Sequence, residues 1–269
     1  MSFFSRFALA AASAVVLILL IDVLVVGGLT ADSRAWYAFL VRAALYALAA
    51  VASAIAAAKF GWWREHIGRA WTLFALEFVC LLVNYILRRA APDARLALEA
   101  TLVAANVAQI GAYWLMARII SAAGIGYVIS RARRAMLTAA ALALAVALCH
   151  VSLAQQWGLL LAGDIRLGSA ISVLADVITF TLAAPLALSA LALRGGQISW
   201  IFGFLTISVF GWMINTGAPS VADLLGGGPD ALRSTRLAGI AIATLFNTAA
   251  AAAQVAASAR AMKGVEADA

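Results

Sequence analysis

The sequence predicts an all-α integral membrane protein, folded as a bundle of about eight transmembrane helices. Of its 269 residues, 65% are hydrophobic and only 12% are charged, whereas about a quarter of the residues of a soluble domain are charged. Apolar stretches of about 20 residues or more, the length that crosses the hydrocarbon of a bilayer, follow one another along nearly the whole chain. The short alternating segments of a membrane β-barrel are absent. The lipid bilayer is therefore the first partner that the sequence implies.

The first expected span has the appearance of a secretion signal, but its apolar run is too long for one, so a permanent helix is expected. The second is rich in alanine (AALYALAAVASAIAAA), which lets neighbouring backbones approach closely. No linker rich in Pro, Gly and Ser divides the chain, so residues 1–260 are expected to form one domain. One flexible-looking loop is expected at 219–234, and a cytoplasmic tail too short to fold at 261–269. The spans are expected at 7–29, 34–58, 68–88, 96–120, 136–161, 168–193, 198–217 and 235–260.

The basic residues predict that both termini lie in the cytoplasm. A net charge of +7 would point to nucleic acid in a soluble protein, but here Lys and Arg lie mostly between the spans, so no nucleic-acid partner is expected. With the N-terminus inside, 11 of the 19 Lys and Arg residues fall in inside segments, among them the run ISRARR at 129–134. Cytoplasmic loops carry such an excess. Arg88, Arg89 and Arg95 fall outside and oppose it.

Polar residues at helical spacing predict a polar interior shared by several helices. In the fourth span Glu99, Asn106 and Tyr113 recur every seven residues with Gln109 beside them, so they share one face, which cannot point to lipid. Such neutral polar side chains often join membrane helices by hydrogen bonds, so structural and binding roles both stay open. The other polar stripes are Glu77 and Asn84 in the third span, Ser208, Trp212 and Asn215 in the seventh, and Thr244, Asn247, Gln254 and Ser258 in the eighth.

Carboxylates inside a membrane are costly, so Glu77, Glu99 and Asp176 each predict either a buried pairing or a ligand or proton site. Asp176 is expected to face the bundle and to find a partner on the polar face of the fourth span, with Asn215 or Asn247 as further candidates. Asp22 and Asp164 lie near the ends of spans and are expected to reach water.

A proline in the sixth span predicts a kink. Pro185 has no N–H to donate to the carbonyl of Thr181, and the helix is expected to bend between these two residues. Asp176 lies nine residues earlier, about half a turn round the helix, so the aspartate and the kink occupy opposite faces.

Residues typical of catalysis or metal binding are few. Cys80 and Cys149 lie within spans and predict neither a disulfide nor a metal cluster. His66 lies in a loop, so it and His150 are badly placed for a bis-histidine haem. His150 is expected to be a buried hydrogen-bonding residue, with proton sensing left open because histidine changes charge near physiological pH. The sequence shows no catalytic nucleophile paired with a general base, so no enzyme activity, cofactor or metal is expected.

Three stretches carry a resemblance to a known family. ANVAQIGAYWLMAR (105–118) resembles the small-Asn…Gly-x-Trp-Leu-x-Arg helix of the bacterial membrane-associated sensor (MASE) domains of the first class. LADVITFTLAAPLALSAL (174–191) is similar to that family's later helix, in which a Pro follows an Asp by about nine residues. GRAWTLFALEFVCLLVNYILRR (68–89) fits the helix that precedes them. The resemblance carries over to Asn106, Arg118, Asp176 and Pro185.

This resemblance implies an eight-helix sensory module in the bacterial cytoplasmic membrane, without an output domain in this chain. In the family such a module stands ahead of a histidine kinase or diguanylate cyclase, so a signalling output domain or a membrane protein is an expected partner, and a homodimer is compatible with it. The expected function is non-catalytic sensing of a small ligand or membrane partner. A small-solute or proton transporter and an accessory subunit of a membrane complex are the alternatives.

Overall fold

The computed structural model describes residues 3–24, 28–122, 130–163, 167–193, 196–224 and 227–267. Regular structure in these ranges is helical, and eight of the helices are long and apolar enough to cross a membrane. The fold is therefore the all-α membrane bundle that the sequence predicts. The helices are α1 (Phe3–Leu24), α2 (Ala31–Lys59), α3 (His66–Ala90), α4 (Arg95–Ala122), α5 (Arg131–Leu161), α6 (Leu167–Ala192), α7 (Gln197–Thr216), α8 (Ala218–Leu224) and α9 (Pro229–Ala267).

Six of the helices form a closed ring. In the order α2, α3, α4, α6, α7 and α9 each helix packs against the next, and α9 packs against α2. α1 lies outside the ring against α9, and α5 lies outside it against α6. Burial follows this arrangement, because 56% of the apolar segment of α9 is buried but only 17% of those of α1 and α5.

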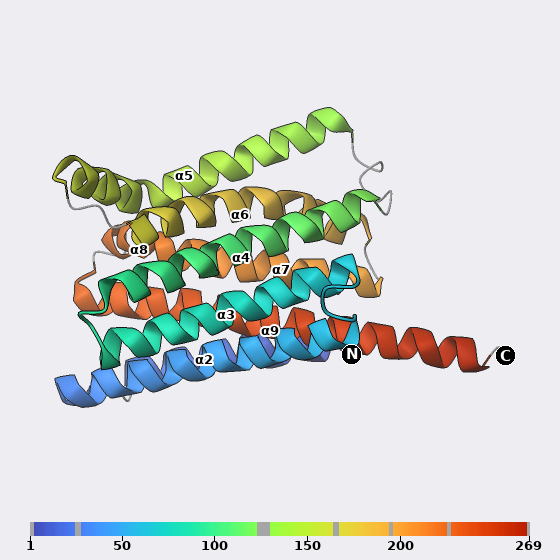
Figure 1. Ribbon diagram of the computed structural model, residues 1–269, viewed down its shortest axis with the longest axis horizontal. Helices are drawn as coiled ribbons and strands as arrows, with labels where there is room; N and C mark the ends of the chain where they lie inside the picture. Colours follow the sequence, from blue (N-terminus) through green and yellow to red (C-terminus); the bar gives the residue numbers. More distant parts are fainter. Residues whose placement is uncertain are drawn as a thin grey trace.

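The bundle has two distinct ends, because its long helices run side by side along one axis (Figure 1). α1 begins and α3 begins at one of them, which we call the near end. α2 begins, α3 ends and α9 begins at the opposite end, which we call the far end. At the near end α9 extends beyond the other helices (Figure 1).

The contact between α7 and α9 depends on a pair of facing glycines. A Cβ atom on Gly211 would lie 2.7 Å from the carbonyl oxygen of Gly239, and one on Gly239 would lie 2.7 Å from the carbonyl oxygen of Gly211. No side chain fits at either position without a backbone shift. This close approach brings Ser208 Oγ to 2.7 Å from the carbonyl oxygen of Ala243, to which it donates a hydrogen bond.

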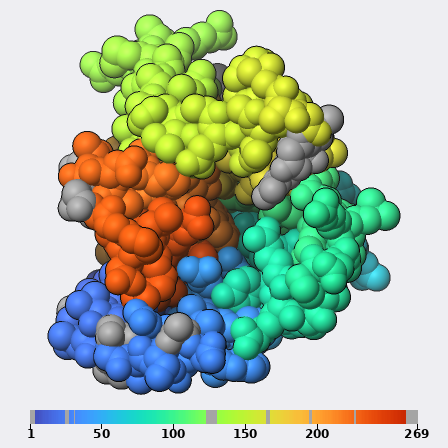
Figure 2. All heavy atoms as spheres, turned by 90° about the vertical axis from the view of Figure 1, so that its left-hand side faces the viewer, coloured from blue at the N-terminus to red at the C-terminus, as the bar shows by residue number. Residues whose placement is uncertain are grey.

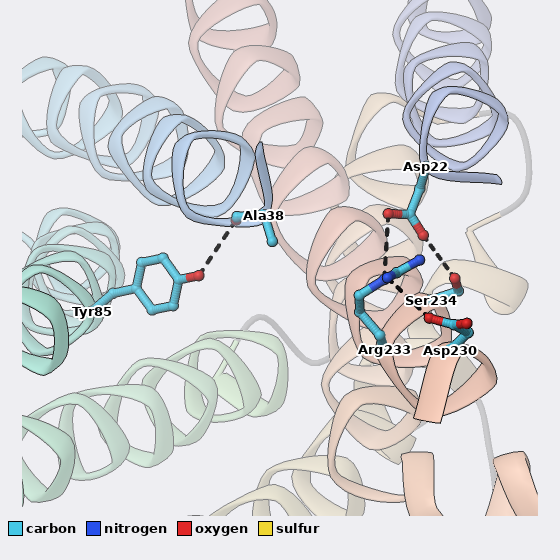
Figure 3. Close-up of polar contacts among 6 residues, drawn as sticks. All are labelled: Asp22, Ala38, Tyr85, Asp230, Arg233 and Ser234. Atoms are coloured by element: carbon cyan, nitrogen blue, oxygen red, sulfur yellow. Dashed lines mark hydrogen bonds and ion pairs between the residues drawn. The ribbon is translucent and has the colours of Figure 1, made fainter. Parts of the chain in front are cut away.

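A polar cluster around the buried Asp22 connects α1 to the start of α9 at the far end (Figure 3). Ser234 Oγ donates to Asp22 Oδ2 at 2.7 Å, and Arg233 Nε lies 3.8 Å from Asp22 Oδ1. Arg233 also pairs with Asp230 at 3.0 Å. Only 1% of Asp22 is exposed, so the expectation that it reaches water is wrong. The first turns of α9 cover it, although it lies near the end of its own helix. Asp164 falls outside the described residues.

The eight expected spans correspond to the eight long helices, with differences at two places. The stretch 219–234, expected to be a flexible loop, holds most of α8 and the start of α9, and Pro229 occupies the first position of α9, where its missing N–H costs nothing. The expected tail is not separate either, because α9 continues through Ala267. Its residues there include Ala, Met, Lys and Glu, which are strong helix formers.

Replacement of Gly211 by alanine is expected to destabilise the protein by about 1–3 kcal/mol, because the added methyl group forces α7 and α9 apart. The measurement is the midpoint of unfolding in detergent. Gly203→Ala is the matched control on the same helix, since a Cβ there meets nothing within 4 Å. It is expected to leave stability unchanged or to raise it slightly. Equal stability of both variants would contradict the close contact.

Candidate functional site

A polar cavity of about 300 Å³ lies inside the ring and opens at the far end. Figure 2 looks onto this end, which is hollowed between the orange atoms of the α8–α9 region, the teal atoms of α3 and α4 and the yellow atoms of α6. Six ring helices and α5 contribute to its wall. The lining residues are Arg42, Tyr46, Glu77, Leu81, Asn84, Tyr85, Arg88, Leu102, Ala105, Asn106, Gln109, Ser152, Gln155, Gln156, Ser169, Ser172, Val173, Asp176, Trp212, Asn215, Thr216, Arg236 and Ile240.

Asp176 lies deep in this cavity, where it joins three helices. Gln109 Nε2 of α4 donates to Asp176 Oδ1 at 3.3 Å, and Thr216 Oγ1 of α7 donates to Asp176 Oδ2. The aspartate is 4% exposed. The prediction that it faces the bundle with a partner on the fourth span is therefore confirmed. Thr216, the last residue of α7, was not among the expected partners.

Glu77 lies in the same deep part of the cavity but lacks such partners. It is 1% exposed, and neither of its carboxylate oxygens accepts a hydrogen bond of normal geometry from a described residue. The indole N–H of Trp212, which also lines the cavity, interacts with the Glu77 carboxylate, but the two do not form a hydrogen bond of normal geometry. Because buried polar groups are usually satisfied, these two groups mark the place where a ligand would form hydrogen bonds.

Three arginines line the part of the cavity nearer to its opening. Arg88 Nε donates to Asn84 Oδ1 at 2.9 Å, and Asn84 in turn donates to the carbonyl oxygen of Leu98 at 2.7 Å. The guanidinium of Arg42 lies 5.9 Å from the centre of the Tyr85 ring. Arg236, one turn before Ile240 on α9, is the third. Their guanidinium groups can bind carboxylate or phosphate oxygens in pairs.

Below the cavity, toward the near end, the ring is filled by large apolar side chains, which we call the aromatic layer. Tyr113 belongs to it, because its ring packs edge-on to Phe74 at 5.0 Å and its hydroxyl donates to the carbonyl oxygen of Leu205 at 3.3 Å. All its members are at most 2% exposed, so the cavity is closed on this side. The layer consists of Trp71, Phe74, Tyr113, Met116, Phe204 and Leu205.

The structure brings together only part of the predicted polar face of α4. Asn106 lines the cavity and donates to the carbonyl oxygen of Leu102 in its own helix at 2.8 Å. Glu99 instead accepts a hydrogen bond from the backbone N–H of Gly168, in the first turn of α6. This N–H has no partner within its helix, so Glu99 acts as a cap between two helices. Tyr113 lies in the aromatic layer.

Two further predicted residues lie away from the cavity. Arg118 is at the near end, with its guanidinium 5.0 Å from the centre of the Trp114 ring, beside a second pocket that Glu65 and His66 line. His150 is exposed, and its Nδ1 lies 2.8 Å from the carbonyl oxygen of Ala147. The expectation of a buried histidine is wrong, because α5 lies outside the ring and buries only one face.

α6 is one helix through Pro185, from Leu167 to Ala192. Thr179 and Thr181 donate to the carbonyl oxygens one turn earlier, those of Ala175 and Val177, at 2.6 and 2.8 Å. Their hydroxyls therefore do not compensate for the donor that Pro185 lacks. The bend between Thr181 and Pro185 stays a prediction.

The arginines are the functional candidates that sequence reasoning missed. Arg42, Arg88 and Arg236 counted only toward orientation, because nothing in the sequence shows that three separate helices bring them to one cavity. A signal was present for Arg42, which falls inside the second expected span, where a cation is costly. The polar residues of α5, Ser152, Gln155 and Gln156, carry a weaker signal of the same kind.

The cavity carries groups that can bind a polar ligand. Its polar groups are amides, hydroxyls, guanidiniums and two carboxylates, which recognise a polar ligand through hydrogen bonds and charge. Among the residues that the structure describes, no cluster of three or more His, Cys, Asp and Glu side chains is placed to hold a metal ion.

Asp176→Leu is expected to destabilise the protein by about 1–3 kcal/mol, because the buried Gln109 amide and Thr216 hydroxyl lose their acceptor. Asp176→Asn retains an acceptor oxygen and is expected to lose less. The measurement is again the unfolding midpoint in detergent, with Ile178→Val on the exposed face of α6 as control. A Leu variant as stable as the wild type would show that the three-helix connection contributes nothing.

Comparison of the chain with models of protein families, with curated proteins and with solved structures finds no match in any of the three. The resemblance to the sensor domains therefore stays a prediction from the three sequence stretches that carry it. What the chain does has to be argued from the cavity itself.

Proposed function

We propose that this protein is a non-catalytic sensory module of the membrane, which binds a small polar ligand in the cavity and transmits binding through α9. The observation that carries the proposal is a polar cavity open at one end and closed by the aromatic layer at the other. A cavity of about 300 Å³ has the size of a small-molecule site.

The path of α9 supports a role in transmission. Arg236 and Ile240, near its start, line the cavity, and the helix then packs along α2 and α7 and leaves the bundle at the near end (Figure 1). A single rigid helix thus connects the ligand site with the opposite end, roughly 45 Å away at 1.5 Å per residue. A shift of α9 against its neighbours, of the kind seen in other switching proteins, would carry the signal.

A transporter is the second candidate, and the position of Pro185 in α6 favours it. Asp176 stands on the same helix, and substrate sites in transporters commonly lie on helices whose hydrophobic sequence contains a Gly or Pro. The aromatic layer argues against it, since it blocks the path from the cavity to the near end, on α3 over the turn from Trp71 to Phe74.

The test uses a chimera in which a diguanylate cyclase is fused after α9. Asp176→Asn is expected to change its cyclic dinucleotide output by about fivefold or more, because allosteric coupling between two sites usually changes affinity by at least this factor. The reason is that the substitution alters the cavity while sparing the fold. Asp93→Asn, the same change in an exposed turn, is the control. Unchanged output in Asp176→Asn at equal protein level would count against sensing, and solute uptake lost in the same variant would favour transport.

We further propose that the near end faces the cytoplasm of a bacterial cell, so that the cavity opens outward. Single cysteines at Ser130 and Gly228, in a background without Cys80 and Cys149, test this with an impermeant thiol reagent on intact cells. Gly228 suits the test because a Cβ there meets nothing within 4 Å. Labelling is expected at position 228 alone, and labelling at position 130 alone would reverse the orientation.

A further inference from the structure

We propose that the ligand of the cavity is a small zwitterion, whose carboxylate binds the arginines near the opening and whose ammonium group binds Glu77 and Asp176 at depth. This inference rests on the proposed function for the role of the site and adds the chemical class of its ligand. It follows from the separation of the two kinds of charge along the cavity.

The two carboxylates lie at one depth. On α3, Glu77 follows Phe74 by three residues, and on the antiparallel α4, Gln109 precedes Tyr113 by four. Because the rings of Phe74 and Tyr113 are in contact at 5.0 Å, Glu77 and Gln109 lie at nearly the same level. Gln109 donates to Asp176 at 3.3 Å, which brings the second carboxylate to that level.

The carboxylates differ in how well they are satisfied. Asp176 accepts hydrogen bonds from Gln109 and Thr216, whereas both oxygens of Glu77 lack a partner of normal geometry among the described residues. A carboxylate that is 1% exposed, with only the poorly aligned indole N–H of Trp212 beside it, has room for a further donor. An ammonium group supplies three N–H donors and a compensating charge.

The guanidiniums of Arg42 and Arg88 lie at a different level, nearer the opening. Arg88 is held by Asn84 at 2.9 Å, and Arg42 lies 5.9 Å from the ring centre of Tyr85, the next residue of α3. Asn84 follows Glu77 by seven residues, so the two levels are roughly 10 Å apart along the helix before the reach of the side chains is subtracted. Arg42 Nε is itself buried without a partner among the described residues.

A ligand with only one kind of charge would leave one level of the cavity uncompensated. An anion would satisfy the arginines and leave Glu77 without a donor, and a cation would leave the guanidiniums without an acceptor. A molecule with both groups several bonds apart satisfies both levels at once, and charge-assisted hydrogen bonds of this kind are the strong ones.

The test uses 4-aminobutyrate and 6-aminohexanoate as probes on the purified full chain in detergent. Each is expected to raise the unfolding temperature in a saturable manner, because a ligand that binds only the folded state stabilises it. Butyrate and butylamine, each carrying one of the two groups, are expected to have little effect at the same concentration. An equal effect of butylamine or of butyrate alone would overturn the proposal, and so would the absence of any effect of both amino acids.

Two variants test whether the probes bind in the cavity. Glu77→Gln and Arg42→Gln are each expected to weaken probe binding by about 30-fold or more, as the loss of one partner of a buried charge pair does, because Glu77 and Arg42 Nε are both buried. Asp93→Asn and Arg95→Gln remove the same charges from exposed positions and are expected to leave binding unchanged. Binding that survives both cavity variants would place the probes elsewhere and overturn the proposal.

Failure of this inference and failure of the proposed function give different results. Probes that bind in the cavity while cavity substitutions leave the output of the cyclase chimera unchanged support the ligand class and count against sensing. A chimera that responds to Asp176→Asn, combined with no probe binding, leaves sensing supported and overturns the zwitterion.

Discussion

Hydrocarbon offers no hydrogen-bond partner, and this constraint arranges the rest of the structure. Polar side chains within the spans have to find partners on neighbouring helices, and in doing so they connect the ring. Ser208 donates from α7 to the backbone of α9, Asn247 donates from α9 to Ser53 of α2 at 3.0 Å, and Asn84 donates from α3 to the backbone of α4. These bonds hold the neighbours of the ring together where lipid provides no hydrophobic driving force between them.

Closure of a ring of six helices leaves a central space, and the two halves of the molecule fill it differently. Toward the near end the aromatic layer occupies it with side chains such as Trp71 and Phe74, both at most 1% exposed. Toward the far end the inward side chains are polar and leave a cavity of about 300 Å³. The glycine pair of α7 and α9 makes the ring narrow on one side, so α9 reaches both the cavity and the axis of the bundle. Under the proposed function, this asymmetry is the basis of ligand binding.

The residues around the cavity differ in how many contacts they make within the protein. Asp176 is hydrogen-bonded to two other helices, so its replacement by an apolar residue is expected to affect folding and, under the proposed function, the response as well. Glu77 and the arginines make fewer contacts within the protein and are better suited to a ligand. The same separation explains the outcome of the sequence analysis. Family resemblance and helical spacing identified Asp176, Gln109 and Asn106. They did not identify Arg42, Arg88 and Arg236.

The sequence by itself determined the membrane location, the eight spans and the inward direction of Asp176, because length, apolar composition and the cost of a buried charge are local properties. It also indicated Gln109 and Glu77, since periodicity places them on interior faces. Only the tertiary structure decided that Glu99 caps α6, that Asp22 is buried under α9 and that His150 is exposed, because each depends on which helix lies alongside. The cavity, too, was decided only by the tertiary structure. Seven helices contribute to its wall, and the residue spacing along one helix does not encode how the others pack around it.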